Sequence, residues 1–261
     1  MEILKNLARA IQFLTVFPLP SFSYFSHHPD QEEETLAENF APSMAFFPLV
    51  GMLIGLVLVA LRWIFNFLPL SPLVSNTLIL LIWIGMSGGL HLDGFADSVD
   101  GFLGGHNQEE ILKIMKDSAI GAKGVLALIS LLLLKLALLI ELPLEIKDGA
   151  LFFAPIMGRW SMVLGTFLGK PARSENSMGK LFMDYLSWRE VALASVIMAV
   201  AGIWLFKLYF LLLLVLGIGI VAGVLKYCQK RISGITGDIL GAINEIVEVF
   251  ILLTLEIVFL Y

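Results

Sequence analysis

Three aspartates with helical spacing are the residues in this sequence best suited to chemistry. They lie in the stretch GGLHLDGFADSVDGFLGG, where Asp93, Asp97 and Asp100 are four and then three positions apart. On a helix this spacing places the carboxylates on one face, where like charges repel. A divalent cation relieves the repulsion, and carboxylate oxygens are ligands that Mg²⁺, or Mn²⁺ in its place, prefers. The spacing therefore predicts a helix face that holds one or two Mg²⁺ ions.

A second acidic cluster lies near the end of the chain, in the stretch GITGDILGAINEIVE. Asp238, Glu245 and Glu248 recur there at helical spacing, and both glutamates fall inside an apolar run, where an ionisable group is costly and usually functional. We predict that this cluster completes the metal site, although pairing of the glutamates with Lys135 or Arg159 is an alternative. The predicted metal ligands are Asp93, Asp97, Asp100, Asp238, Glu245 and Glu248.

Basic residues between the two clusters favour phosphate binding. Lys116 and Lys123 accompany a helix start at Gly121, where free backbone amides attract anions. Arg159 lies within an apolar run and is expected to meet a buried carboxylate or a phosphate. Anchoring of the chain at the membrane surface is the alternative role of the two lysines.

Carboxylates for a metal, cations for phosphate and no nucleophilic triad together predict phosphoryl chemistry at a membrane surface. The attacking hydroxyl would displace a leaving group from phosphorus in line, with a carboxylate orienting or deprotonating it. The predicted catalytic residues are Asp93, Asp97, Asp100 and Glu245, and the predicted phosphate-binding residues are Lys116, Lys123 and Arg159.

The composition indicates that membrane-spanning helices position these residues. Of the 261 residues, 58% are hydrophobic and only 15% charged, and the net charge of −5 argues against a nucleic-acid partner. Long apolar runs predict an all-α bundle of about seven transmembrane helices, with six to eight as the range, in one domain without a sheet. The predicted spans are about 44–66, 73–92, 124–142, 149–169, 190–206, 208–225 and 241–261.

The segments outside the spans have their own predicted roles. Residues 1–20 alternate apolar and polar side chains at helical spacing, which favours a helix lying in the membrane interface. Residues 21–43 form an acidic polar segment, and residues 88–123 form an acidic motif and loop.

Most of the 17 Lys and Arg fall on the side of the N-terminus and of the 88–123 loop. By the positive-inside rule, this side is cytoplasmic and the protein lies in the cell membrane. Only Arg62, Lys147 and Lys207 fall on the other side.

The aspartate stretch resembles the signature of the cobalamin synthase family, the adenosylcobinamide-GDP ribazoletransferases. AIQFLTVFPLP, FFPLVGMLIG, IMKDSAIGAKGV and GITGDILGAINEIVE are similar to other blocks of that family, in the same order, over about residues 10 to 255. The resemblance implies a multi-pass membrane enzyme that joins adenosylcobinamide-GDP to α-ribazole or its 5′-phosphate, releases GMP and requires Mg²⁺. It implies corrinoid and ribazole substrates, and leaves open a homo-oligomer or association with other enzymes of vitamin B12 synthesis.

The chain departs from the family pattern at two positions. Val16 stands where FLTR-like sequences carry Arg, and Ala119 stands where DSR-like sequences carry Arg. If those arginines bind phosphate, then Lys116, Lys123 or Arg159 must take their place here.

Two other functions also use spaced carboxylates on membrane helices. A CDP-alcohol phosphotransferase is expected to carry an Ala-Arg pair shortly after Asp93-Gly94, but this chain continues Phe95-Ala96-Asp97. A divalent-cation transporter is expected to show internal repeats and carboxylates near mid-membrane. The sequence shows no repeat and places most of its carboxylates at helix ends.

Overall fold

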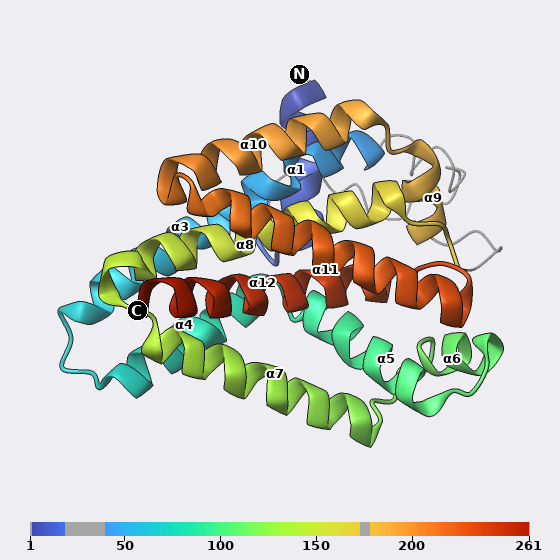
Figure 1. The fold of residues 1–261 in the computed structure, drawn as a ribbon, viewed down its shortest axis with the longest axis horizontal. Helices are drawn as coiled ribbons and strands as arrows, with labels where there is room; N and C mark the ends of the chain where they lie inside the picture. The colour runs from blue at the N-terminus through green and yellow to red at the C-terminus, as the bar shows by residue number, and fades with distance from the viewer. Residues whose placement is uncertain (1, 19–39, 173–177, 261) are drawn as a thin grey trace.

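The computed structural model describes residues 2–18, 40–172 and 178–260, and all the regular elements in these ranges are helical. The prediction of an all-α helix bundle is confirmed (Figure 1). The elements are α1 (Glu2–Leu14), the 3₁₀-helix η1 (Ala41–Phe46), α3 (Phe47–Asn66), α4 (Pro72–Met86), α5 (Leu90–Gly104), α6 (Gln108–Ile114), α7 (Ala122–Glu141), α8 (Leu144–Leu168), α9 (Met178–Tyr185), α10 (Trp188–Phe206), α11 (Tyr209–Ile232) and α12 (Gly237–Leu260).

Among the described residues, five helical segments are long and apolar enough to cross a membrane, and a sixth is added if α4 and α5 count as one broken span. The five are η1 with α3, α7, α8, α10 and α11. The run predicted at 241–261 corresponds to α12. This helix is as long as the spanning helices but is not among the five, and it carries the acidic residues Asp238, Glu245, Glu248 and Glu256. The predicted count of about seven is thus five or six by length and apolarity.

The predicted span 73–92 is wrong at its end, because the chain turns between α4 and α5. The two helix axes differ by 86°, and Gly88 and Gly89 have φ angles of 62° and 75° at the turn. Glycine adopts these left-handed angles without steric cost. Because the apolar run continues across the turn, the sequence alone does not show where α4 ends. Helix α5 itself is not one of the five spans.

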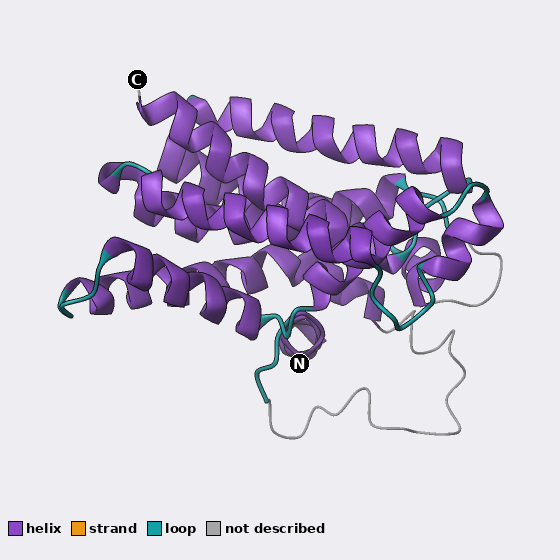
Figure 2. Ribbon diagram, turned by 90° about the horizontal axis from the view of Figure 1, so that it is seen from below, coloured by secondary structure: helices purple, strands orange, loops and turns teal. Residues whose placement is uncertain are grey.

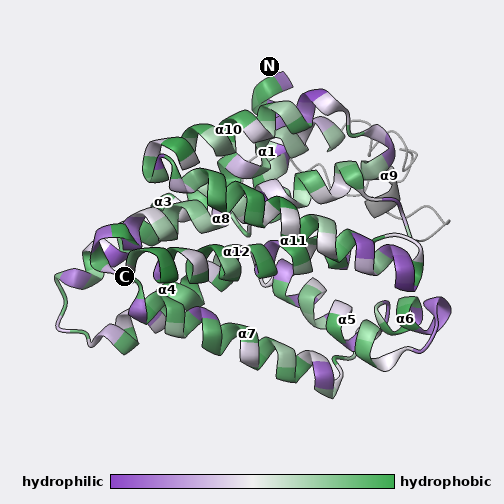
Figure 3. Cartoon of the chain, viewed as in Figure 1, coloured by the Kyte–Doolittle hydropathy of each residue, from purple (hydrophilic) through white to green (hydrophobic). Residues whose placement is uncertain are grey.

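Helices α8 and α12 occupy the middle of the bundle, with α3, α7, α10 and α11 around them (Figure 1). Helix α8 is buried along most of its length. Figure 3 shows apolar residues along the middle of the long helices and hydrophilic residues at α6 and the adjacent end of α11. This distribution fits a bundle whose long helices cross a bilayer and whose α5–α6 end lies at one membrane surface.

Helix α1 runs across the long helices, and Figure 2 shows this N-terminal helix end-on beneath them. Ala8, Ala10 and Leu14 are buried against the bundle, whereas Ile3 and Leu4 are exposed. The helix ends at Leu14 instead of reaching residue 20, and its location in the membrane interface stays a prediction.

The predicted acidic segment 21–43 lies outside the described residues up to position 39. From Phe40 onward the chain is already helical and largely buried, so the predicted boundary at 43 is too late.

Candidate active site

Helix α5 carries the three aspartates and packs closely against the start of α12. A Cβ atom added to Gly94 would lie 2.7 Å from the carbonyl oxygen of Asp238, and one added to Gly241 would lie 3.2 Å from the Cα of His91. Small residues at these positions let the two helix backbones approach each other. The segments that carry the two acidic clusters therefore lie side by side at α5 and the start of α12, whereas a metal site shared between them stays a prediction.

This convergence concentrates negative charge around Asp97. Burial and then the neighbouring carboxylates of Asp93, Asp238 and Asp100 raise the pKa of Asp97 to about 6. The Thr236 hydroxyl donates a hydrogen bond of 3.1 Å to Asp238. Since like charges at one surface favour a bound cation, Asp93, Asp97 and Asp238 form the acidic centre of the candidate site.

Asp100 faces away from this centre, toward the start of α7. Its two carboxylate oxygens accept hydrogen bonds of 2.7 Å from the Gly121 amide and 2.8 Å from the Gly124 amide. A Cβ atom at either glycine would lie within 2.4 Å of an Asp100 oxygen, so both positions require glycine. The amides that the sequence assigned to a phosphate therefore bind the Asp100 carboxylate, which fixes α5 against α7.

Glu245 and Glu248 form a separate ionic cluster inside the bundle. Lys135 Nζ lies 3.1 Å from a Glu245 oxygen and also forms an ion pair with Glu248, which forms a second pair with Arg159. The Asn244 amide donates hydrogen bonds of 3.2 Å to each glutamate. The pairing that the sequence left as an alternative is the one observed, and it leaves Asp93, Asp97 and Asp238 as the candidate metal ligands.

The three predicted phosphate-binding residues are not brought together. Arg159 is only 1% exposed and pairs with Glu248, whereas Lys116 is exposed after α6. Lys123 donates a hydrogen bond to the carbonyl oxygen of Leu103, at the end of α5. These three side chains therefore do not form a single phosphate-binding site.

Arg231 helps to hold the C-terminal end of α5 in place, a role that the sequence did not predict. Its guanidinium donates hydrogen bonds of 3.2 Å to the carbonyl oxygens of Phe102 and Gly105. Together with Lys123, it satisfies backbone acceptors at the C-terminal end of α5. The contact joins distant parts of the chain, and no local pattern predicts it.

The two positions that depart from the family pattern lie in different places. The Val16 amide donates a hydrogen bond of 2.9 Å to the carbonyl oxygen of Met86, beside the turn between α4 and α5. Ala119 is exposed in the loop between α6 and α7, where its amide donates a bond of 3.0 Å to Asp117.

An apolar cavity of about 220 Å³ adjoins the acidic centre, and its lining includes Asp93 and Asp238. Aromatic rings form much of its wall: Phe13 lies 6.0 Å from Phe47 and 5.9 Å from Phe182 between ring centroids. These rings come from α1, α3 and α9, so the N-terminal helix contributes to the site. Neither residue type nor spacing predicts this role for the three rings, although Phe13 and Phe47 lie in blocks similar to the family's.

His91 also lines this cavity and is almost fully buried. Burial lowers the pKa of its imidazole well below the ordinary value, and the charges of Arg159 and Lys135 lower it further. Its Nε2 atom has no hydrogen-bond partner among the described residues. A neutral imidazole thus lies between the cavity and the buried ionic cluster.

Known proteins resemble the chain over nearly its whole length. A family profile described as cobalamin-5-phosphate synthase matches residues 6–256. The adenosylcobinamide-GDP ribazoletransferase of Desulforamulus reducens is 36% identical over 95% of this chain and 94% of its own length. The proteins of the same name from Syntrophobacter fumaroxidans and Caldanaerobacter subterraneus are 36% and 34% identical, each over 95% of this chain and 96% of the relative. No solved structure matches significantly. With this agreement in sequence, the chain belongs to the cobalamin-5-phosphate synthase family.

Proposed function

We propose that the chain joins adenosylcobinamide-GDP to α-ribazole or its 5′-phosphate and releases GMP, the activity after which its relatives are named. The observation that supports this function best is the acidic centre of Asp93, Asp97 and Asp238 beside an aromatic cavity. Nothing observed favours the two alternative functions, a CDP-alcohol phosphotransferase or a divalent-cation transporter.

The acidic centre is the proposed site of Mg²⁺. Its donors are hard carboxylate oxygens. Burial and then the neighbouring carboxylates raise the pKa of Asp97, and a cation would relieve the repulsion among these carboxylates. Within the part of the chain that the structure describes, no three potential ligands stand close enough to hold a metal as they are. The fit therefore rests on the chemistry and charge of the donors. When bound, Mg²⁺ would neutralise the diphosphate of the substrate and favour displacement at phosphorus.

Asp238 is the proposed proton acceptor for the attacking hydroxyl of the ribazole. Asp238 lines the cavity, whereas Glu245 lies in the buried ionic cluster, where it pairs with Lys135. The hydroxyl oxygen forms a bond to the phosphorus attached to cobinamide, and its proton passes to Asp238. The bond between this phosphorus and the oxygen that bridges to GMP breaks, and GMP leaves with the bonding electrons.

The aromatic cavity is the proposed site of the ribazole base. A benzimidazole is flat and apolar, and rings such as Phe13, Phe47 and Phe182 favour offset or edge contacts with it. A cavity of about 220 Å³ is too small for a corrin ring, which must lie outside it. With the base in this cavity, the sugar hydroxyl would point toward Asp93 and Asp238.

The assay that tests the activity is GMP release from adenosylcobinamide-GDP and α-ribazole by the purified protein in lipid nanodiscs. Product should form with Mg²⁺ and stop when EDTA removes the metal. Exchange of a CDP-alcohol, or uptake of Mg²⁺ into proteoliposomes without GMP release, would contradict the proposal.

We also propose that the α5–α6 end and the N-terminus face the cytoplasm in the cell membrane, since most basic residues lie on that side. Cys228 is fully buried, so introduced cysteines can be labelled against a low background. In intact cells, an impermeant maleimide should label Phe67→Cys and should label Glu109→Cys only after permeabilisation. The reverse pattern would invert the topology.

A further inference from the structure

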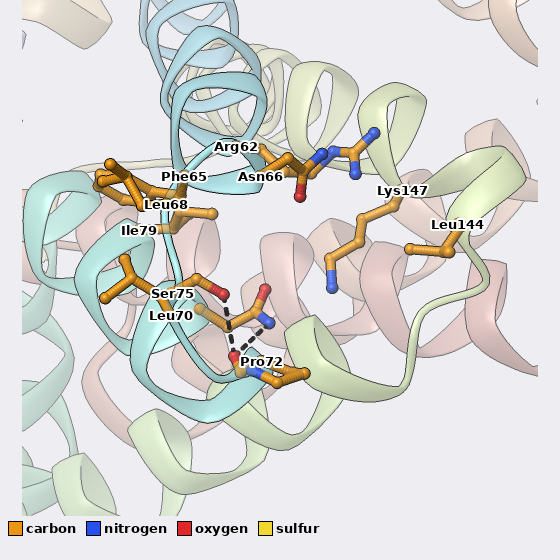
Figure 4. A pocket seen from close by; sticks show the side chains of 11 residues that line it. Arg62, Phe65, Asn66, Leu68, Leu70, Pro72, Ser75, Ile79, Leu144 and Lys147 are labelled. Atoms are coloured by element: carbon orange, nitrogen blue, oxygen red, sulfur yellow. Dashed lines mark hydrogen bonds between the residues drawn. The ribbon is translucent and has the colours of Figure 1, made fainter.

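A second cavity, more polar than the first, lies at the opposite end of the bundle from α5, lined by the end of α3, the start of α4 and the start of α8 (Figure 4). Its volume is about 200 Å³, and its lining combines the cations Arg62 and Lys147 with apolar residues such as Leu68, Leu70 and Leu144. None of these residues belongs to the proposed catalytic site.

Lys147 is the most informative residue of this cavity. The residue is only 5% exposed, and Figure 4 shows its side chain extending into the cavity. Its ammonium forms no hydrogen bond or close ion pair with any residue in the described ranges, although Asp148 and Glu141 attract it from farther away. Burial takes the ammonium partly out of water without giving it a contact partner, and a bound anion would offset that loss of solvation.

Arg62 brings a second positive charge to the same cavity. Its Nε atom donates to one oxygen of Asp148, and the Trp63 indole donates a hydrogen bond of 3.1 Å to the other. This arrangement orients the guanidinium and uses only one of its nitrogen atoms in the described contacts. Arg62 and Lys147 repel each other, which adds to the need for an anion between them.

The presence of two basic residues in one cavity is unusual for this side of the membrane. Arg62, Lys147 and Lys207 are the three basic residues assigned to this side of the membrane, and two of them line one cavity. Basic residues are generally sparse on that side, so anchoring by positive charge does not explain the pair. The apolar part of the lining and the exposed Trp63 and Phe67 fit the boundary between headgroups and acyl chains.

We propose that this cavity binds the phosphate of an anionic phospholipid headgroup, with Lys147 and Arg62 as its cationic ligands. The apolar residues of the lining would contact the glycerol and the start of the acyl chains. The site is independent of the proposed transferase reaction.

Native mass spectrometry of the full-length protein in detergent, with added phosphatidylglycerol or phosphatidylcholine, tests the proposal. Phosphatidylglycerol should remain bound and raise the Tm, and phosphatidylcholine should do neither. Lys147→Gln should weaken retention of phosphatidylglycerol about fivefold or more, whereas Lys147→Arg should retain it. Lys207→Gln is the matched control, because it removes an exposed basic residue from the same side and should change nothing.

Three outcomes would overturn the proposal. The first is equal retention of phosphatidylglycerol by wild type and Lys147→Gln, and the second is equal retention of the two lipids by wild type. The third is a rise in Tm with inorganic phosphate as large as that with phosphatidylglycerol, which would assign the cavity to a free anion. GMP release by Lys147→Gln should equal that of wild type, which shows that the variant is folded.

Discussion

The carboxylate of Asp100 in α5 accepts a 2.8 Å hydrogen bond from the backbone amide of Gly124, in the first turn of α7. The same carboxylate accepts a bond from Gly121, so it acts as the anion at the start of the next helix. The last of the three aspartates thus holds α5 against the start of α7. The other two, Asp93 and Asp97, are left beside Asp238 in the acidic centre.

Asp100→Asn should destabilise the protein and lower activity only as a consequence. The asparagine retains one acceptor oxygen but turns an NH₂ group toward a second amide, which leaves a buried donor unsatisfied. The free energy of unfolding should fall by about 1–3 kcal/mol. Thermal unfolding in detergent measures this, and Asp117→Asn, at an exposed loop position, is the control. An unchanged Tm would contradict the structural role of Asp100.

Asp93→Asn and Asp97→Asn should have the opposite effect, with normal folding and little product. Each change keeps the shape of the side chain and removes a charge that the proposed Mg²⁺ requires. GMP release should fall at least about a hundredfold, since charge stabilisation of this kind contributes several kcal/mol to the transition state. Turnover close to wild type, with normal dependence on Mg²⁺, would place the active site elsewhere.

The spacing of the aspartates predicted the helix and the face that carries Asp93 and Asp97, because helical periodicity is a local property. The second acidic cluster suggested that α12 lies near α5, but the closeness of the two backbones at Gly94 and Gly241 is seen only in the structure. The sequence could not show that Asp100 turns toward α7, because the amides that hold it come from another helix.

Other features depend on packing between distant segments. The turn after α4 requires left-handed φ angles at Gly88 and Gly89, and the apolar run across it looks like one continuous span. Glu245 and Glu248 have the spacing of metal ligands, and only the positions of α7 and α8 show that cations already neutralise them.

The response of Mg²⁺ binding to pH should reveal the acidic centre directly. The raised pKa of Asp97, about 6 instead of 3.8, means that this carboxyl takes up a proton at a higher pH than an ordinary aspartate. Protons then compete with the metal below pH 6, while above pH 6 the carboxylate is ionised and available. The Mg²⁺ concentration for half-maximal activity should rise up to about tenfold per pH unit below 6 and level off above it. A constant value from pH 5 to pH 8 would exclude Asp97 as a ligand.

Glu248→Gln should be one of the most destabilising single changes in the bundle. Glu248 is fully buried and is the shared partner of Lys135 and Arg159, so its loss leaves two buried cations with too little negative charge. Breaking a buried ion pair in this way costs about 3–5 kcal/mol. Glu256→Gln, on the same helix, is the control. Adding Arg159→Met to Glu248→Gln should recover part of the Tm, and a further loss would argue against charge imbalance as the cause.

Removal of an aromatic ring from the cavity should affect one substrate selectively. Phe182→Ala deletes a ring that contacts Phe13 and lines the proposed site of the ribazole base. Loss of one aromatic contact is expected to raise the KM for α-ribazole about two- to tenfold. The KM for adenosylcobinamide-GDP should stay within about twofold, since the cavity is too small to hold the corrin ring. Phe206→Ala removes a buried ring that packs on Phe153, away from the cavity, and controls for general loss of stability. If Phe182→Ala raised both KM values equally, the cavity would serve folding or the corrinoid, and the ribazole base would bind at another place.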